Sequence, residues 1–273
     1  DADDVALMML SGGTTALSKV IPRTHNDYVY NSLQSGVVAG FGPDTVYLAS
    51  LPMSHGYTLS SPGILATLAH GGTAVIAPDV RAETVFPLIE KARVTVVAGG
   101  VPLAVNWLAS DWPERCDLSS LKVFMNGGAR LLPALRRQIE ARFGCIYVES
   151  YGAGEGLLNQ TRLDDPEEIR FNSSGRPISP ADEVKVLDDQ GIEVPDGVVH
   201  ERMVRLRADL ARDLQGDTRA QRRAACRRPV WLESVTEPPV GVLEWSQGID
   251  HRPGRSGPEV VGEAGDLQRA SES

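Results

Sequence analysis

Short apolar runs alternate with helix-like segments along the first part of the chain, and this alternation restricts the fold more than any other feature. Strand-like runs are followed after short links by segments whose apolar residues recur at helical spacing. Such alternation predicts an α/β fold with a mainly parallel sheet, because parallel strands need long crossover connections. The expected strands are residues 5–10, 45–51, 73–77, 94–98, 121–125 and 145–149, and the expected helices are residues 26–38, 60–69, 82–92, 102–109 and 133–143.

Four groups of small and polar residues follow expected strands, at the edge of a parallel sheet where ligands tend to bind. The first, residues 11–19, reads Ser-Gly-Gly-Thr-Thr-Ala-Leu-Ser-Lys. Small residues, hydroxyls and one Lys suit a phosphate cradle, although a flexible loop has the same composition. The group is not a Walker loop, because no Gly-Lys-Ser/Thr stands at the required spacing.

The other three groups are residues 51–57 (Leu-Pro-Met-Ser-His-Gly-Tyr), 126–129 (Asn-Gly-Gly-Ala) and 151–156 (Tyr-Gly-Ala-Gly-Glu-Gly). Taken alone, His55 is more often a structural hydrogen-bonding residue than a functional one. Paired glycines allow flat backbone contact with a ligand ring, but they also form ordinary turns. Glu155 is suited to holding a hard cation such as Mg²⁺, or to lying solvated in a loop.

Together, the order of the four groups and their positions after strands resemble the adenylate-forming superfamily. That superfamily comprises acyl- and aryl-CoA synthetases, luciferase-like enzymes and the adenylation domains of peptide synthetases. Within it, residues 4–198 are most similar to aryl-acid AMP ligases of the 2,3-dihydroxybenzoate–AMP ligase type. The closer similarity lies in residues 11–19, 21–25, 51–63 and 151–169, and is particularly marked at Thr-Arg-Leu-Asp-Asp-Pro-Glu-Glu, residues 161–168.

The resemblance implies that residues 1–198 form part of the large N-terminal domain of the adenylate-forming fold, with mainly parallel sheets and flanking helices. The small C-terminal domain of the family is expected to be absent. Family members activate a carboxylic acid with ATP and Mg²⁺ and pass it to a thiol, commonly that of a carrier protein. The implied function is activation of an aryl acid in siderophore or nonribosomal-peptide biosynthesis. The alternatives are an inactive fragment that retains at most nucleotide binding, and an acyl- or aryl-CoA ligase.

The resemblance also assigns roles to individual residues. It implies that Lys19, His55 and Glu155 are catalytic, and that Glu155 and Thr15 hold Mg²⁺. The residues expected to contact ATP are Ser11, Gly12, Thr14, Thr15, Lys19, Gly128, Ala129 and Tyr151. The residues expected to contact the aryl acid are His55, Gly56, Tyr57, Ser61, Gly127 and Leu158.

Two positions depart from the family pattern. Ala16 replaces a usual Gly, which stiffens or crowds the loop, since Ala does not readily adopt positive φ. Gly56 stands where the family commonly has Asn in contact with the acid. The loss of that side chain removes a hydrogen bond, and we expect it to open room for a larger or amino-substituted acid.

The composition changes near residue 198. Residues 199–273 contain 12 Arg but no Lys, Phe, Tyr or Asn, and their apolar residues follow no clear period. One interpretation is a disordered tail rich in Arg, Gly and Pro.

Another interpretation comes from the genetic code. Degenerate codons for residues 209–222, read one base late, permit Thr-Leu-Arg-Gly-Thr-Tyr-Lys-Ala-Thr-Pro-Glu-His-Asn, which resembles the family's next segment. We therefore hypothesise a frameshift near residues 198–208 and expect residues 199–273 to be non-homologous and poorly ordered.

Composition also restricts the partners. The formal charge of −9 disfavours a nucleic-acid partner. No run approaches the length of a membrane-spanning helix, so no membrane partner is expected. The 3 Cys lack metal-type spacing and fit a reducing compartment, which predicts a cytoplasmic protein.

Overall fold

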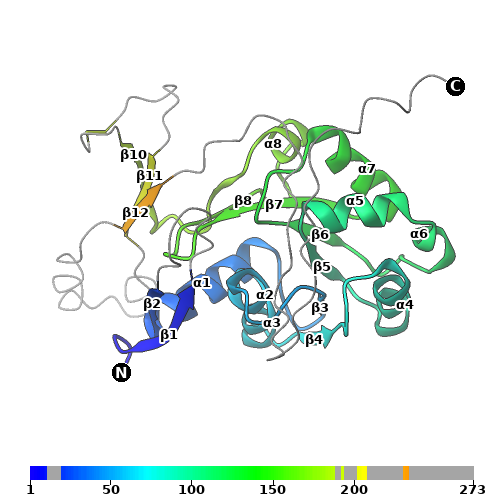
Figure 1. Cartoon of the computed structure of the whole chain (residues 1–273), viewed down its shortest axis with the longest axis horizontal. Coiled ribbons are helices and arrows are strands. Elements are labelled where there is room, and N and C mark those ends of the chain that lie inside the picture. Colours follow the sequence, from blue (N-terminus) through cyan, green and yellow to red (C-terminus); the bar gives the residue numbers. More distant parts are fainter. Residues whose placement is uncertain (11–19, 188–191, 194–201, 208–229, 234–273) are drawn as a thin grey trace, which may run out of the picture. The chain divides into compact units, whose positions relative to one another are not determined.

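The computed structural model describes residues 1–10, 20–187, 192–193, 202–207 and 230–233, and its centre is a seven-stranded sheet (Figure 1). The strand order is β4-β3-β5-β6-β7-β8-β9. Strands β3 to β7 pair in parallel, whereas β8 and β9 add to the sheet in antiparallel fashion. This arrangement confirms the predicted α/β fold. The strands are β3 (Val46–Ala49), β4 (Thr73–Ile76), β5 (Val96–Gly99), β6 (Val123–Asn126), β7 (Ile146–Gly152), β8 (Leu158–Gln160) and β9 (Arg176–Pro177).

Helices cover both faces of the parallel strands (Figure 1). On one face, α4, α5 and α7 pack against Leu48, Phe124 and Tyr147. On the other face, α2 and α3 pack against Ala49 and Met125, and α1 lies against α3. The helices are α1 (His25–Val38), α2 (Gly56–Ser60), α3 (Ile64–Ala69), α4 (Ala82–Ala92), α5 (Val101–Ala109), α6 (Trp112–Arg115), α7 (Pro133–Phe143) and α8 (Glu167–Asn172).

The chain reverses its direction across the sheet between β3 and β5. It runs from β3 to β4 on one side, returns to β5 on the other side of β3, and continues to β6 and β7. In open α/β sheets, ligands bind at the carboxyl ends of the strands beside such a reversal. The loop that follows β3 contains His55, so the topology places this residue where a ligand is expected.

Two further antiparallel arrangements accompany the large sheet. A hairpin of β1 and β2 brackets residues 11–19, which lie outside the described residues. A three-stranded sheet has the order β10-β11-β12. Two of its strands fall within residues 199–273, most of which lie outside the described part of the chain. The bounds are β1 (Val5–Leu10), β2 (Val20–Thr24), β10 (Glu183–Leu187), β11 (Arg202–Arg207) and β12 (Val230–Glu233).

The prediction of one helix over residues 60–69 is wrong in its first part. The chain instead forms α2 and α3, which are separated at Ser61–Gly63. Pro62 disfavours helical geometry at the residue before it. Gly63 has a non-helical backbone, with φ −146° and ψ −145°, and a Cβ atom there would overlap the Thr58 carbonyl group. This break allows α2 to begin at Gly56, directly after His55.

We predict that Gly175→Ala destabilises the protein more than Gly144→Ala. Both glycines have positive φ, +80° and +68°, so an added Cβ strains each backbone by roughly 1–2 kcal/mol. At Gly175 the Cβ would also overlap the backbone of Gln160 in β8, whereas nothing lies within 4 Å at Gly144. We expect the free energy of unfolding, measured with urea, to fall by about 2 kcal/mol more for Gly175→Ala. Equal losses in the two variants would contradict this close packing.

Candidate active site

The described residues of the predicted site gather at the carboxyl ends of the parallel strands. His55 follows β3, Gly127 follows β6, and Glu155 lies in the loop after β7. Asn126, the last residue of β6, pairs with Glu149 of β7, which continues to Gly152 before its loop begins. The predicted phosphate-binding residues Ser11, Gly12, Thr14, Thr15 and Lys19 lie outside the described residues.

His55 caps the beginning of α2. Its Nδ1 accepts a hydrogen bond from the backbone N–H of Tyr57 at 3.2 Å. Partial desolvation lowers the pKa of the His55 imidazole below its usual range. The imidazole is therefore neutral near pH 7, and because Nδ1 accepts, Nε2 carries the proton and can donate it in a hydrogen bond.

The Tyr57 ring lies against the backbone of Gly127. A Cβ atom at Gly127 would come within 2.9 Å of this ring, so only glycine allows the contact. Burial, followed by the nearby Tyr47, raises the pKa of Tyr57 well above its ordinary value, which keeps the phenol neutral. At Gly128, with φ +86°, a Cβ would meet nothing within 4 Å. Gly128 is therefore the residue of this turn whose backbone is not covered by neighbouring atoms.

Gly56 is buried beside the β1–β2 hairpin. A Cβ atom at Gly56 would lie 2.5 Å from Cε of Met9. The sequence predicted that the missing side chain opens room at this position. In the structure, the Met9 methyl group occupies this space instead.

The remaining predicted contacts lie on α2, β7 and β8. Ser61 ends α2, and its Oγ lies 3.0 Å from Oγ of Ser60. Tyr151 is half-buried near the end of β7. Leu158 is buried on β8 and pairs with Gly152 across the strands. The structure thus places Tyr151 and Leu158 on paired strands, and Ser61 at the end of α2.

A buried polar network lies behind the turn formed by residues 127–129. Nδ2 of Asn126 donates to the carbonyl oxygen of Ala129 at 2.7 Å. The same Nδ2 lies 3.3 and 3.2 Å from the two carboxylate oxygens of Glu149. Glu149 therefore orients the amide that holds the turn.

Glu149 is itself surrounded by polar partners. The Arg136 guanidinium lies 3.1 Å from its carboxylate, and the two side chains are 0% and 2% exposed, respectively. The Tyr147 hydroxyl donates to the same carboxylate. Burial raises the pKa of Glu149 to about 7, although Tyr147 and Arg136 act in the opposite direction. This network was not predicted, and its one signal in the sequence is an ionisable residue within an apolar strand.

The loop that carries Glu155 is held by β2 and α1. The Arg23 guanidinium, which pairs with Asp27, donates to the carbonyl oxygen of Gly154 at 2.7 Å. Nδ2 of Asn31 donates to the carbonyl oxygen of Gly156 at 3.2 Å. Both contacts flank Glu155, so its backbone position depends on side chains that follow residues 11–19 in the sequence.

Among the described residues, Glu155 is the one that was predicted to bind a metal ion. Within the described ranges, no group of three or more His, Cys, Asp or Glu side chains could hold a metal ion. Mg²⁺ in nucleotide sites is commonly held by one or two carboxylates together with phosphates and water. A half-buried single carboxylate fits that mode of binding.

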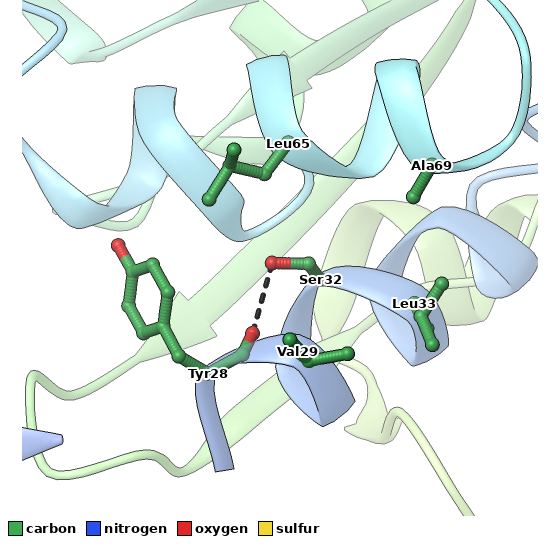
Figure 2. Close-up of a pocket in the computed structure, with 6 residues that line it drawn as sticks. All are labelled: Tyr28, Val29, Ser32, Leu33, Leu65 and Ala69. Atoms are coloured by element: carbon green, nitrogen blue, oxygen red, sulfur yellow. Dashed lines mark hydrogen bonds between the residues drawn. The ribbon is translucent and has the colours of Figure 1, made fainter. Parts of the chain in front are cut away.

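Two hollows lie elsewhere and contain no predicted site residue. One, of about 200 Å³, is formed by Tyr28, Val29, Ser32 and Leu33 of α1 with Leu65 and Ala69 of α3 (Figure 2). Its wall is almost entirely apolar, because Ser32 donates its hydroxyl hydrogen to the Tyr28 carbonyl oxygen. The other, of about 780 Å³, is lined mainly by residues at or just before the amino ends of β3, β5, β6 and β7.

Among the helices that the structure describes, none has the length and apolar character needed to cross a membrane.

Comparison with known proteins identifies relatives over most of the chain. Residues 1–206 match the family model described as AMP-binding enzyme. The chain is 48% identical over 196 residues to the 2,3-dihydroxybenzoate-AMP ligase of Bacillus subtilis (strain 168), covering 72% of this chain and 36% of that protein. It is 44% identical over 190 residues to a 2-hydroxy-7-methoxy-5-methyl-1-naphthoate–CoA ligase of Streptomyces carzinostaticus, covering 69% and 34%.

A solved structure shows the same fold. The anthranilate CoA ligase AuaEII, in complex with anthranoyl-AMP, superposes with a TM-score of 0.69 at 25% identity, covering 76% of this chain and 40% of that chain. The present chain spans about a third of the length of the curated relatives that it matches. The similarity therefore concerns one portion of these longer proteins.

We predict that Glu149→Gln flattens the dependence of stability on pH between pH 5 and 8. An acid whose pKa rises on folding, here from 4.5 to about 7, stabilises the native state below pH 4.5, and this contribution is lost as pH rises to about 7. The wild type should therefore lose up to ~3 kcal/mol relative to Glu149→Gln across this range, measured by urea unfolding.

Glu114→Gln provides the control. Glu114 is exposed, and its pKa is lowered by Arg142, so it titrates below this pH range. Its stability curve should run parallel to that of the wild type. Parallel curves for Glu149→Gln and the wild type would contradict the buried titration.

Proposed function

The chain belongs to the AMP-binding enzyme family, and from this we propose that it is part of an enzyme that activates an aryl carboxylic acid as its adenylate. A carboxylate oxygen attacks the α-phosphorus of ATP, forming an acyl phosphate bond, while the bond to the β-phosphate breaks and pyrophosphate leaves. The observation that carries this proposal is the 48% identity to a 2,3-dihydroxybenzoate-AMP ligase. The family match over residues 1–206 includes every predicted site residue.

In this proposal, ATP binds along the strand-end loops. Residues 11–19 surround the pyrophosphate end, with the charge of Lys19 offsetting that of the phosphates. The open backbone at Gly128 supports a nucleotide contact there, together with Ala129 and Tyr151. Glu155 and Thr15 would hold Mg²⁺, which neutralises phosphate charge when bound.

The aryl acid binds next to α2. The neutral imidazole of His55 donates from Nε2 toward the acid, while Gly56, Tyr57, Ser61, Gly127 and Leu158 surround the ring. The acid is of the 2,3-dihydroxybenzoate type, or a bulkier or amino-substituted relative. The enzyme acts in siderophore or nonribosomal-peptide biosynthesis and passes the acid to the phosphopantetheine thiol of an aryl carrier protein.

Coenzyme A is the alternative acceptor, which the similarity to a naphthoate–CoA ligase favours. Comparing thioester formation with a carrier protein and with coenzyme A separates the two. The other alternative is a chain that binds nucleotide without turnover.

We also propose that residues beyond 198–208 are translated out of the family's reading frame. The family match ends at residue 206, close to the change in composition. We predict that resequencing the DNA from the codon for Tyr151 onward reveals a single-base difference that restores the family's remaining segments. If the DNA confirms the present sequence and no alternative frame encodes those segments, the frameshift is ruled out.

We predict that an aryl acid such as 2,3-dihydroxybenzoate stimulates ATP–pyrophosphate exchange by the chain. Lys19→Ala should lower the exchange rate about 100-fold, because a cation that stabilises developing phosphate charge is lost. Lys91→Ala, which changes an exposed cation on α4, should leave the rate unchanged. AMP binding without any exchange would favour the inactive alternative, and exchange insensitive to Lys19→Ala would contradict the assigned role.

A further inference from the structure

The β1–β2 hairpin places a methionine side chain in the space beside Gly56. A Cβ atom at Gly56 would lie 2.5 Å from Cε and 3.6 Å from Sδ of Met9. Gly56 is buried, and it directly follows His55 at the start of α2. A side chain at position 56 would therefore compete with the Met9 thioether for one volume.

The strand register fixes the direction of Met9. Met9 pairs with Ile21 across the hairpin, and residues directly opposite one another point to the same face of an antiparallel pair. Cδ1 of Ile21 would lie 2.9 Å from a Cβ atom at Gly154, beside Glu155. The hairpin thus places Met9 beside Gly56 and Ile21 beside Gly154, in two different segments of the candidate site. Met8 and Leu10, which alternate with Met9, are 61% and 74% exposed.

We propose that Met9 sets the size limit of the aryl-acid pocket, so that the site accepts a single-ring acid with no polar substituent on the edge that faces Gly56. This inference rests on the proposed function and deepens it by choosing among the candidate acids. A second fused ring on that edge would need the volume that the Met9 methyl group occupies.

The chemistry of this wall also limits the substituent. A thioether sulfur is only a weak hydrogen-bond acceptor and cannot donate, and glycine has no side chain. A hydroxyl or amino group directed at this wall would lose its hydrogen bonds with water and gain at most a weak one to the Met9 sulfur. Polar substituents are therefore expected on the other edges of the ring.

The test is to compare dissociation constants for benzoate and 1-naphthoate, measured calorimetrically on the full chain in the presence of AMP. The wild type should bind benzoate more tightly than 1-naphthoate. Met9→Ala should shift the ratio of the two constants by about tenfold toward 1-naphthoate, as expected when a pocket gains room for additional carbons. Met8→Ala, which shortens the exposed neighbour in the same strand, should leave the ratio unchanged.

A second measurement tests the contact itself. Gly56→Ala should lower the midpoint of thermal unfolding in the wild-type background more than in the Met9→Ala background, because the added methyl group meets Met9 only in the former. The inference is overturned if Met9→Ala leaves the benzoate-to-naphthoate ratio unchanged, or if Gly56→Ala has the same effect in both backgrounds. If the proposed function itself fails, no variant binds either acid and none catalyses acid-dependent exchange. That result overturns both the proposed function and the inference about Met9.

Discussion

The ion pair between Arg136 and Glu149 joins the interior of the domain to the edge where the candidate site lies. In addition to this ion pair, the Arg136 guanidinium donates hydrogen bonds to the carbonyl oxygens of Leu131, Arg170 and Ser173, at 2.7, 2.9 and 3.0 Å. It therefore connects α7 and the residues around α8 with β7. A buried ion pair is weak evidence of net stability, because desolvation opposes the attraction. Its consequence here is positional: Glu149 faces the amide that holds the turn after β6.

The other site loops are likewise held by side chains from distant segments. The carbonyl groups of Gly154 and Gly156 accept hydrogen bonds from β2 and α1, and the Tyr57 ring rests on Gly127. In each case a partner from another element supplies the contact, and at Gly127 the absence of a side chain allows it. The loops are thus positioned by tertiary packing more than by their own conformational preferences. A substitution in the hairpin or in α1 would therefore change the positions of the site loops, even where the substituted residue contacts no ligand.

This dependence explains which features the sequence could predict. The helices at residues 82–92 and 133–143 have the predicted bounds, because periodic apolar residues and an initial proline at Pro133 mark them locally. The site loops could be found because small and polar residues follow apolar strands. The break at Pro62, which separates α2 from α3, was missed although Ser-Ser-Pro-Gly at residues 60–63 is a local turn signal. The network around Glu149 and the contact of Met9 with Gly56 depend on segments far apart in the chain, which no local pattern reveals.

His55 and Tyr57, at the start of α2, are both neutral side chains. Desolvation lowers the pKa of His55 and raises that of Tyr57, so each side chain is held in its uncharged form. Met9 adds an apolar side chain beside Gly56, the residue between them in the sequence. Under the proposed function, the positive charge for phosphate comes from Lys19, on the segment between β1 and β2. The hairpin that carries Lys19 toward ATP would then also bring Met9 to the acid, so one element would serve both substrates.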